Sequence, residues 1–429
     1  MYKCSEVMNF LNEVSYQYPS ADSLASGRPN EDHFDSINFK QYEQSFIKYF
    51  SEKKGIQSER AEKLLYQYGP TAGIANEIFK TYLSSQFEIS CESEQIIITN
   101  GCQEALTLLI IEFLKAESDY ILIPEPSYIG ISGIVKALGK NMKPVSMLRY
   151  DHNVNQYVLD LNTLELNILS LRNSNKCPKL IYLNLDFNNP LGFSVSEQDK
   201  LALLALCQKH DIAIIEDNPY GLFNFAEQKM PTLKSLDSDN RVFYIDSFAK
   251  TLCPALRVGC LVCPLGREKQ VKSLIELKSF VSVNTSQLSQ SIITGFLLTN
   301  SFNFKGKLEA ANKDYLDRRN AMLSALEKHF GLLENVSWNT PGGGFFLVIN
   351  TPWEFTFNDV EECARDFGVI FMPVSFFANE DTHWSKVIRL AYSNLDAAQI
   401  EVAVSKLAKF LVHKQQTSQS TKSEIEHAL

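Results

Sequence analysis

Between residues 90 and 265, short apolar segments alternate with amphipathic ones, and this alternation limits the possible folds more than any other feature. The apolar segments have the length and composition of buried strands: Gln95–Thr99, Tyr120–Ile123, Leu180–Leu185, Ile212–Glu216, Val242–Ile245 and Val258–Cys263. Apolar residues recur at helical spacing over Gln103–Lys115 and Ser196–His210. Strands that alternate with helices predict an α/β fold around a mostly parallel sheet, whose ligands gather at the carboxyl ends of the strands.

The C-terminal third has a different pattern. A long helical segment, Phe304–Phe330, precedes strands at Phe346–Ile349 and Val387–Ala391, with a helix predicted over Asn358–Phe367 between them. We predict a large domain over residues 50–300 and a smaller α+β domain that combines residues 1–49 with 301–412. Residues 413–429 are rich in Ser, Thr and Gln, so they are predicted to form a polar tail that begins as a helix and is disordered at its end.

Charge and composition exclude several classes of function. The 429 residues include 41 Lys and Arg against 50 Asp and Glu, which gives a net charge of −9 and argues against nucleic acid as a partner. No apolar stretch is long enough to span a membrane, and the first residues lack the unbroken apolar segment of a secretory signal. Nine cysteines, an odd number, are typical of free thiols in a reducing compartment. The sequence therefore predicts a cytoplasmic protein of the size of an enzyme.

One cysteine pair has the spacing of a metal site. Cys260 and Cys263 form a single C-x-x-C within a predicted strand, and no second pair accompanies it. Residues three apart on a strand point to opposite faces, so the two sulfur atoms could not share one ion. We therefore predict no metal site.

Polar residues follow three of the predicted strands directly. A glycine turn at Gly101 opens a helix, whose N-terminus suits a phosphate, although turns of this kind are common in proteins without one. Asp217 ends a very apolar strand, where it could cap a helix or face a cationic group. Lys250 follows another such strand and has few polar neighbours in the sequence. Desolvation would lower the pKa of its amine, which makes Lys250 a candidate Schiff-base nucleophile.

These segments resemble motifs of the pyridoxal-phosphate-dependent aminotransferases of classes I and II, which have fold type I. The segment 247–259 resembles their cofactor-lysine signature, and four others resemble their phosphate, ring-stacking, Asn-Pro and carboxylate-arginine motifs: 66–73, 126–128, 188–192 and 388–393. The segments 23–27 and 376–379 are similar to the 2-aminoadipate and kynurenine aminotransferase branch. The motifs occur in the family's order over nearly the whole chain. The resemblance therefore implies an α/β, fold-type-I enzyme that transfers an amino group.

The resemblance also implies a role for each matched residue. Lys250 would hold pyridoxal 5'-phosphate as an aldimine and move the substrate proton, and Asp217 would pair with the pyridinium nitrogen. Tyr220 and Asn189 would bond the 3'-oxygen of the ring, and Tyr128 would stack on its face. The phosphate would be bound by Gly101, Cys102, Gln103, Ser247, Arg257 and Tyr68.

Substrate binding and assembly follow from the same resemblance. Arg389 would bind the substrate carboxylate, together with Asn189, while Gly27 closes over the substrate and Arg28 lies beside it. Tyr68 would reach the phosphate of the partner subunit, so the active unit would be a homodimer. The implied reaction is a ping-pong transfer of an amino group from an L-amino acid to a 2-oxo acid.

The sequence departs from the family pattern at several positions and leaves other functions open. Leu191, Leu185, Cys102 and Arg28 replace residues that the family usually has there, so the resemblance implies cofactor binding more directly than it implies the reaction on the substrate. An alternative is a non-transaminating pyridoxal-phosphate enzyme of the same fold, such as an oxidase, cyclase, lyase or decarboxylase. A transcription regulator would need a helix-turn-helix before residue 23, and a catalytically inactive binding protein would not need both Lys250 and Asp217. The tight turns of the family also predict cis peptide bonds before Pro126 and Pro190.

Overall fold

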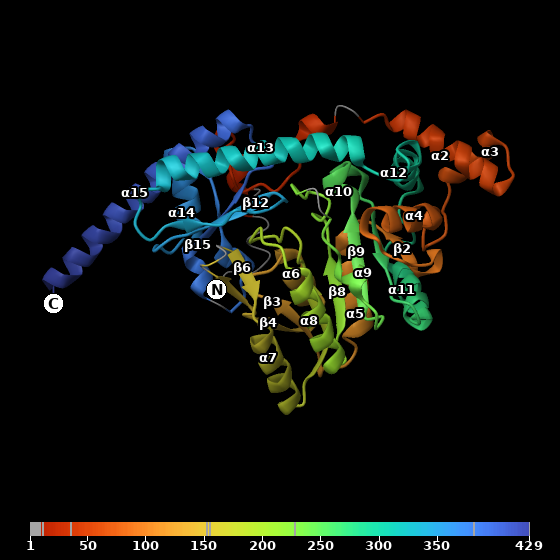
Figure 1. Cartoon of the computed structure of the whole chain (residues 1–429), viewed down its shortest axis with the longest axis horizontal. Coiled ribbons are helices and arrows are strands. Elements are labelled where there is room, and N and C mark those ends of the chain that lie inside the picture. The colour runs from red at the N-terminus through yellow and green to blue at the C-terminus, as the bar shows by residue number, and fades with distance from the viewer. Residues whose placement is uncertain are drawn as a thin grey trace.

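The computed structural model describes residue 10 and residues 13–34, 37–151, 153, 156–226, 229–380 and 382–428. A central sheet with its helices forms one part of the molecule, and a second, smaller sheet lies beside it under a long helix (Figure 1). In these residues, no helix combines the length and the apolar character that crossing a membrane requires.

The central sheet has seven strands in the order β2-β10-β9-β8-β7-β3-β4. All neighbours are parallel except β10, which runs antiparallel to both β2 and β9. The strands span Ile96–Thr99 (β2), Asp119–Pro124 (β3), Asn141–Val145 (β4), Cys177–Leu183 (β7), Ala213–Asp217 (β8), Val242–Ser247 (β9) and Gly259–Val262 (β10). Every residue of β2, β8, β9 and β10 is buried, as expected for strands covered on both faces.

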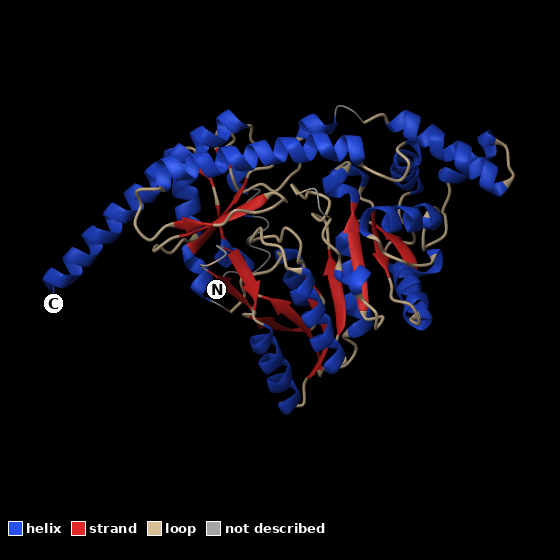
Figure 2. Cartoon of the chain, viewed as in Figure 1, coloured by secondary structure: helices blue, strands red, loops and turns tan. Residues whose placement is uncertain are grey.

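Helices cover both faces of this sheet (Figure 2). Helices α5, α6 and α11 pack on one face, and α7 and α8, together with α4 and α12, pack on the other. They span Asn76–Phe87 (α4), Cys102–Phe113 (α5), Ile129–Ala137 (α6), Leu161–Asn173 (α7), Glu197–Lys209 (α8), Glu268–Val281 (α11) and Gln287–Thr299 (α12). Cys260 lies in the core on one face of the sheet and Cys263 in the core on the other, as the strand geometry predicts.

The smaller sheet is antiparallel, with the order β11-β12-β15-β14. Its strands are Ser337–Trp338 (β11), Phe346–Asn350 (β12), Met372–Pro373 (β14) and Val387–Ala391 (β15), and the helices around it are Lys305–Phe330 (α13), Phe357–Glu362 (α14) and Ala397–Ala428 (α15). The N-terminal strand Asp22–Ser23 (β1) pairs with Val369–Ile370 (β13), so the beginning of the chain joins its C-terminal third. The domain boundaries remain a prediction.

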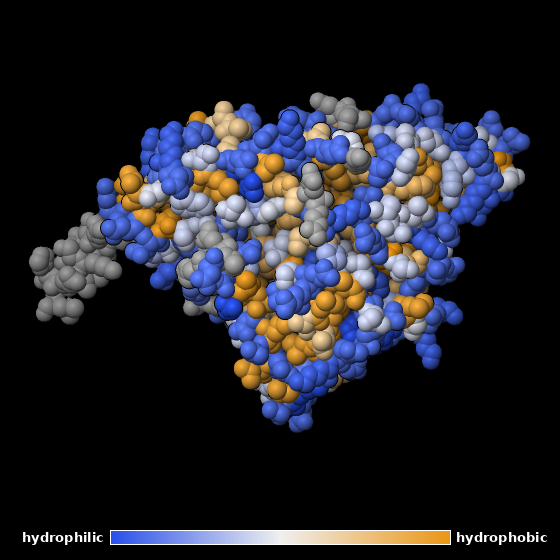
Figure 3. Space-filling view, in the orientation of Figure 1, coloured by the Kyte–Doolittle hydropathy of each residue, from blue (hydrophilic) through white to orange (hydrophobic). Residues whose placement is uncertain are grey.

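The remaining elements are short or peripheral. The helices are Phe39–Lys54 (α2), which packs along α12, Ser58–Leu65 (α3), Leu233–Leu236 (α9) and Phe248–Thr251 (α10). Leu148–Asp151 (β5) and Gln156–Leu159 (β6) pair as a separate hairpin. The face in Figure 3 is largely hydrophilic, with apolar patches toward the lower end where α7 and α8 expose Leu166, Leu169 and Leu201.

The structure agrees with most predicted elements and differs at particular ones. All six predicted strands of the large domain are present within a few residues, and the bonds before Pro126 and Pro190 are both cis, as predicted. The helix predicted over Asn358–Phe367 becomes a π-helix at Cys363–Phe367. Helix α15 extends through the beginning of the polar tail, as predicted, and its helical bounds reach Ala428 (Figure 1); disorder at the end of the tail stays a prediction. Residues 413–429 contain neither proline nor glycine, the residues that most disfavour a helix.

Candidate active site

Three strand ends bring the predicted polar residues together. Because β2, β8 and β9 run in the same direction, the residues that follow them emerge at one edge of the sheet. The antiparallel β10 starts at that edge, where Gly259 pairs with Thr99 on one side and with Ser247 on the other. The glycine turn, Asp217 and the lysine segment therefore meet at a single place, as the sequence predicts.

Asp217 presents one free carboxylate oxygen. It is 3% exposed, and its Oδ2 accepts a hydrogen bond of 2.7 Å from the hydroxyl of Tyr182. Its Oδ1 is buried and has no hydrogen-bond partner among the described residues. Burial raises the pKa of this carboxyl to about 6, although Tyr182 and the nearby Cys102 thiol oppose the shift. An oxygen of this kind can accept a hydrogen bond from a protonated ring nitrogen.

The surroundings of Lys250 make its amine easier to deprotonate. It lies in α10, and its Nζ donates a hydrogen bond of 2.8 Å to the carbonyl oxygen of Gly27. Burial, with smaller contributions from the charges of Arg389, Arg28 and Arg257, lowers the pKa of the Lys250 amine to about 8. A substantial fraction of this amine is therefore neutral at moderately alkaline pH.

An anion-binding turn lies at the start of α5. Gly101 caps the helix with a φ of 74°, which favours glycine, and the first backbone N–H groups of a helix, here those of Cys102 and Gln103, have no partner within it. A Cβ on Gly101 would lie 3.1 Å from Nη2 of Arg257, so that guanidinium is adjacent to the turn. The hydroxyl of Ser247 lies at the neighbouring strand end and accepts from the N–H of Ala249. The dipole and the arginine both favour a phosphate here.

Two tyrosines, Tyr128 and Tyr220, lie beside the anion-binding turn and Lys250, each next to a side-chain amide. The side-chain amide of Gln103 donates a hydrogen bond of 2.6 Å to the hydroxyl of Tyr128, so Gln103 has a structural partner besides any ligand. Burial raises the pKa of Tyr128 to about 12 and also raises that of the Tyr220 phenol, which lies beside Asn189. Both phenols therefore stay protonated and can donate hydrogen bonds.

Arg389 is a buried guanidinium that can still accept a carboxylate. It lies in β15 and is 4% exposed, with Nη1 donating to Asn189 Oδ1 (2.7 Å) and Nη2 to the carbonyl oxygen of Ala25 (2.6 Å). The rings of Phe346 and Phe377 lie 4.3 and 4.8 Å from its Cζ. Burial lowers its pKa to about 10, and its Nε has no partner among the described residues.

Two positioning residues escaped the sequence analysis. Asn184 donates from Nδ2 to the carbonyl oxygen of Asp217 (2.7 Å), and its Oδ1 accepts from the N–H of Asn189 (2.8 Å). It therefore fixes the carboxylate strand relative to the Asn-Pro turn. Tyr182 holds Asp217 directly. The sequence does offer one indication of these two residues. Asn184 and Tyr182 each place a polar group within the predicted apolar strand, and a buried polar group needs a hydrogen-bond partner.

The N-terminal segment closes the site over Lys250. A Cβ on Gly27 would lie 2.3 Å from Cζ of Phe346, so only glycine fits there without movement. Arg28 is exposed, and its carbonyl oxygen accepts a hydrogen bond of 2.7 Å from Ser393. No ion pair joins its side chain to another described residue.

Tyr68 lies outside this arrangement. It follows α3 and is 84% exposed in the single chain, without a hydrogen bond from its side chain to the other predicted site residues among those described. The structure therefore brings together the predicted residues with this one exception.

Comparisons with known proteins give the family. The profile of "Aminotransferase class I and II" matches residues 24–407. The chain is 32% identical over 407 residues to the (S)-3,5-dihydroxyphenylglycine transaminase of Amycolatopsis orientalis, covering 94% of this chain and 91% of that protein. It is 28% identical to the mitochondrial kynurenine/alpha-aminoadipate aminotransferase of Mus musculus, covering 81% and 83%.

A solved structure extends the agreement to the fold. The kynurenine aminotransferase of Pyrococcus horikoshii, solved in complex with PMP, superposes with a TM-score of 0.78 at 25% identity and covers 96% of this chain and 95% of that one. This confirms the predicted fold-type-I architecture and the similarity to kynurenine and 2-aminoadipate aminotransferases. The chain belongs to the class I and II aminotransferase family, whose members depend on pyridoxal phosphate.

Proposed function

We propose that this aminotransferase uses pyridoxal 5'-phosphate to move the amino group of an L-amino acid to a 2-oxo acid by a ping-pong mechanism. Two features at the same edge of the sheet support this proposal. The pKa of the Lys250 amine is lowered, and one buried oxygen of Asp217 has no hydrogen-bond partner among the described residues. When bound, the cofactor supplies an electron sink that stabilises negative charge at the substrate α-carbon. The residues of this chain supply binding, orientation and proton transfer.

The cofactor would be bound at both ends. Asp217 Oδ1 would accept the N–H of the pyridine ring and keep that nitrogen protonated, and the hydrogen bond from Tyr182 to Oδ2 favours the charged carboxylate that this role requires. Tyr220 and Asn189 would bond the 3'-oxygen, and Tyr128 would cover the face of the ring. The groups assembled around the turn would hold the phosphate at the other end: Gly101, Cys102, Gln103, Ser247 and Arg257.

Lys250 would act twice in one turnover. Its Nζ would hold the cofactor, a role that requires the neutral amine that burial and the neighbouring arginines favour. The same Nζ would then act as general base and general acid, taking the proton from the substrate α-carbon and giving it back during the transfer. Gly27 covers this amine in the structure and would exclude water from it.

The substrate carboxylate would bind to Arg389. The guanidinium is fixed by Ala25 and Asn189 and packed against two phenylalanine rings, so little side-chain freedom is lost when a carboxylate binds. Its unpartnered Nε supports this role. The positive charge of Arg28 at the edge of the same segment would favour substrates with an acidic or polar side chain.

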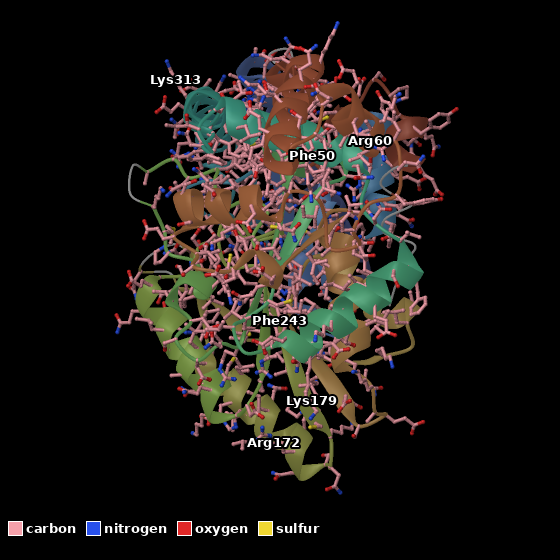
Figure 4. The ribbon with its side chains drawn as sticks, turned by 90° about the vertical axis from the view of Figure 1, so that its right-hand side faces the viewer. Phe50, Arg60, Arg172, Lys179, Phe243 and Lys313 are labelled. Carbon is pink, nitrogen blue, oxygen red and sulfur yellow. The ribbon has the colours of Figure 1, made fainter. Side chains whose placement is uncertain are left out.

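A homodimer would complete the site. The chain exposes large apolar side chains around Tyr68 and at the corner between α11 and α12, on the face that Figure 4 shows with α11 across the front. They are Tyr66, Tyr68, Phe280, Val281, Val283 and Leu288. A second copy that covers this face would bury these side chains and place its Tyr68 at the phosphate of the first.

Isotope transfer tests the proposed reaction. The protein loaded with pyridoxal phosphate is incubated with individual ¹⁵N-labelled L-amino acids and a panel of 2-oxo acids, and the products are identified by mass spectrometry. We expect ¹⁵N to appear in the amino acid derived from the oxo acid. Release of carbon dioxide or ammonia, or a cyclised product, without transfer of the label would identify a non-transaminating enzyme instead.

A further inference from the structure

A buried ion pair lies behind the turn that starts α5. The Nζ of Lys278 and Oε2 of Glu104 are 2.7 Å apart, and their side chains are 0% and 6% exposed. Burying two charges is costly, and a buried pair often stabilises a fold no better than apolar residues of the same size. A pair in this place can instead serve to specify one conformation of the polar groups that it contacts.

Glu104 holds the residue that precedes the turn. It is the third residue of α5, and its Oε2 accepts the backbone N–H of Asn100 over 2.8 Å. Its Oε1 accepts the side-chain amide of the same residue over 3.2 Å. Both oxygens therefore fix Asn100, which leads directly into Gly101.

Lys278 anchors that carboxylate to two other elements. Besides Glu104, its Nζ donates to the hydroxyls of Ser282 (3.0 Å) and Thr285 (3.1 Å), so each ammonium hydrogen has an acceptor. Thr285 in turn donates to the carbonyl oxygen of Ile98 in β2 (3.0 Å). The ammonium thus ties the end of α11 and the segment after it to the strand that carries the turn.

This network fixes the direction of the anion-binding N–H groups. Gly101 has a φ of 74°, which glycine adopts freely along with other values, and Glu104 holds the peptide before it from within the same helix. Without the carboxylate, the turn would sample other conformations, and the N–H groups of Cys102 and Gln103 would lose their common orientation. Neither Glu104 nor Lys278 lies among the groups that would contact the ligand.

We propose that Glu104 and Lys278 are positioning residues for the phosphate-binding turn, and that they raise affinity for the phosphate group specifically. This inference rests on the proposed cofactor. A specific effect on phosphate affinity would distinguish this role from a purely structural one, because an ion pair that only stabilises the fold would change the affinity for all ligands by the same factor. The distinguishing quantity is the ratio of the dissociation constants of pyridoxal and pyridoxal phosphate, which measures what the phosphate contributes to binding.

The test titrates the cofactor-free protein with pyridoxal phosphate and, separately, with pyridoxal, following protein fluorescence. It compares the wild type with Glu104→Gln and Lys278→Met. We expect each variant to bind pyridoxal phosphate about tenfold more weakly, whereas the affinity for pyridoxal changes less than twofold. The inhibition constant of inorganic phosphate against pyridoxal phosphate should rise by a similar factor. The nearly isosteric Glu104→Gln provides the result even if Lys278→Met does not fold.

Lys200→Met is the matched control. Lys200 lies in α8, on the opposite face of the central sheet from α5 and α11, and forms another buried ion pair with Asp186, 2.6 Å long. Its removal should leave the ratio of the two dissociation constants unchanged. If Glu104→Gln weakens both ligands equally, or weakens neither, the positioning role is refuted. A wild-type protein that binds no pyridoxal phosphate would refute the proposed cofactor itself, whatever the variants do.

Discussion

The Nζ of Lys250 donates a hydrogen bond of 2.8 Å to the carbonyl oxygen of Gly27, a residue 223 positions earlier in the chain. The bond joins the lysine after β9 to the N-terminal segment that also accepts from Arg389 at Ala25 and from Ser393 at Arg28. The amine and its cover are therefore fixed together. Because Phe346 lies against Gly27, a side chain at position 27 would lift this segment from the site.

The environment of Lys250 predicts a pH dependence. Since the pKa of its amine is lowered from its ordinary value of 10.5 to about 8, the cofactor-free protein should capture pyridoxal at a rate that rises with pH and levels off above about 8. Arg389→Leu removes the second-largest cause of the shift and should move the midpoint to higher pH. The measurement is the rate of borohydride-trapped labelling of Lys250 by pyridoxal across pH. A midpoint near 10.5 in the wild type would contradict the environment described for this amine.

The buried carboxylate of Asp217 should strengthen cofactor binding but lower the stability of the cofactor-free protein. The pKa of Asp217 is about 6 in the folded protein, above its ordinary value. The free energy of unfolding of the cofactor-free protein therefore declines as pH rises from about 4 to 6, and above pH 6 the protein bears the full cost of burying the charged carboxylate. Asp217→Asn should therefore raise the free energy of unfolding of the cofactor-free protein by about 1–3 kcal/mol at pH 7.5 and hardly at pH 4. Denaturant titrations at both pH values measure this difference.

The same variant should lose activity. Asparagine cannot keep the pyridine nitrogen protonated, so turnover should fall by about a hundredfold or more while the chain remains folded. A variant that is no more stable at pH 7.5 and still turns over at the wild-type rate would show that Asp217 faces no ring nitrogen.

Arg389 should determine the affinity for the substrate carboxylate. Arg389→Lys loses the planar fork, and about 1.5–3 kcal/mol of charged hydrogen bonding corresponds to a fall of roughly 10- to 150-fold in kcat/KM. The dissociation constant of pyridoxal phosphate should stay within twofold, because Arg389 is assigned to the substrate. If cofactor affinity falls as far as kcat/KM, the guanidinium serves the cofactor or the fold.

Arg28 should select among donors. Arg28→Leu should lower kcat/KM for a dicarboxylic amino donor by about tenfold and spare apolar donors, since ~1.4 kcal/mol corresponds to one decade. Arg60→Leu, at an exposed arginine of α3 (Figure 4), controls for the change in net charge. Equal effects on both donor classes would leave Arg28 without a role in selection.

The sequence predicts the parts of the site that depend on strand ends. Asp217 and Ser247 end the apolar strands β8 and β9, and Gly101 follows β2 closely. These three strands run in the same direction, so their ends meet at one edge of the sheet. The long-range bonds behind them are not predictable in this way. Lys278 meets Glu104 across 174 positions, and Asn184 reaches Asp217 from a neighbouring strand, so both depend on how the elements pack. Local periodicity carries no such information.

The surroundings of Tyr68 and Arg389 are also not predictable from local sequence patterns. Nothing in the spacing of the sequence places Tyr68 relative to the other site residues, and its part in the site depends on a second copy of the chain. The motif that contains Arg389 suggests its role, whereas its position between the rings of Phe346 and Phe377 follows from how the strands and loops of the smaller sheet pack.

Every role proposed for the site depends on Lys250, so the most direct measurement asks which residue carries the cofactor. The loaded protein is reduced with borohydride, digested and mapped by mass spectrometry, with Lys250→Ala treated in parallel. We predict one phosphopyridoxyl group, on Lys250, and none in the variant, which should also lose turnover while remaining folded. A label on another lysine, or turnover near the wild-type rate in Lys250→Ala without added amine, would contradict the proposed mechanism.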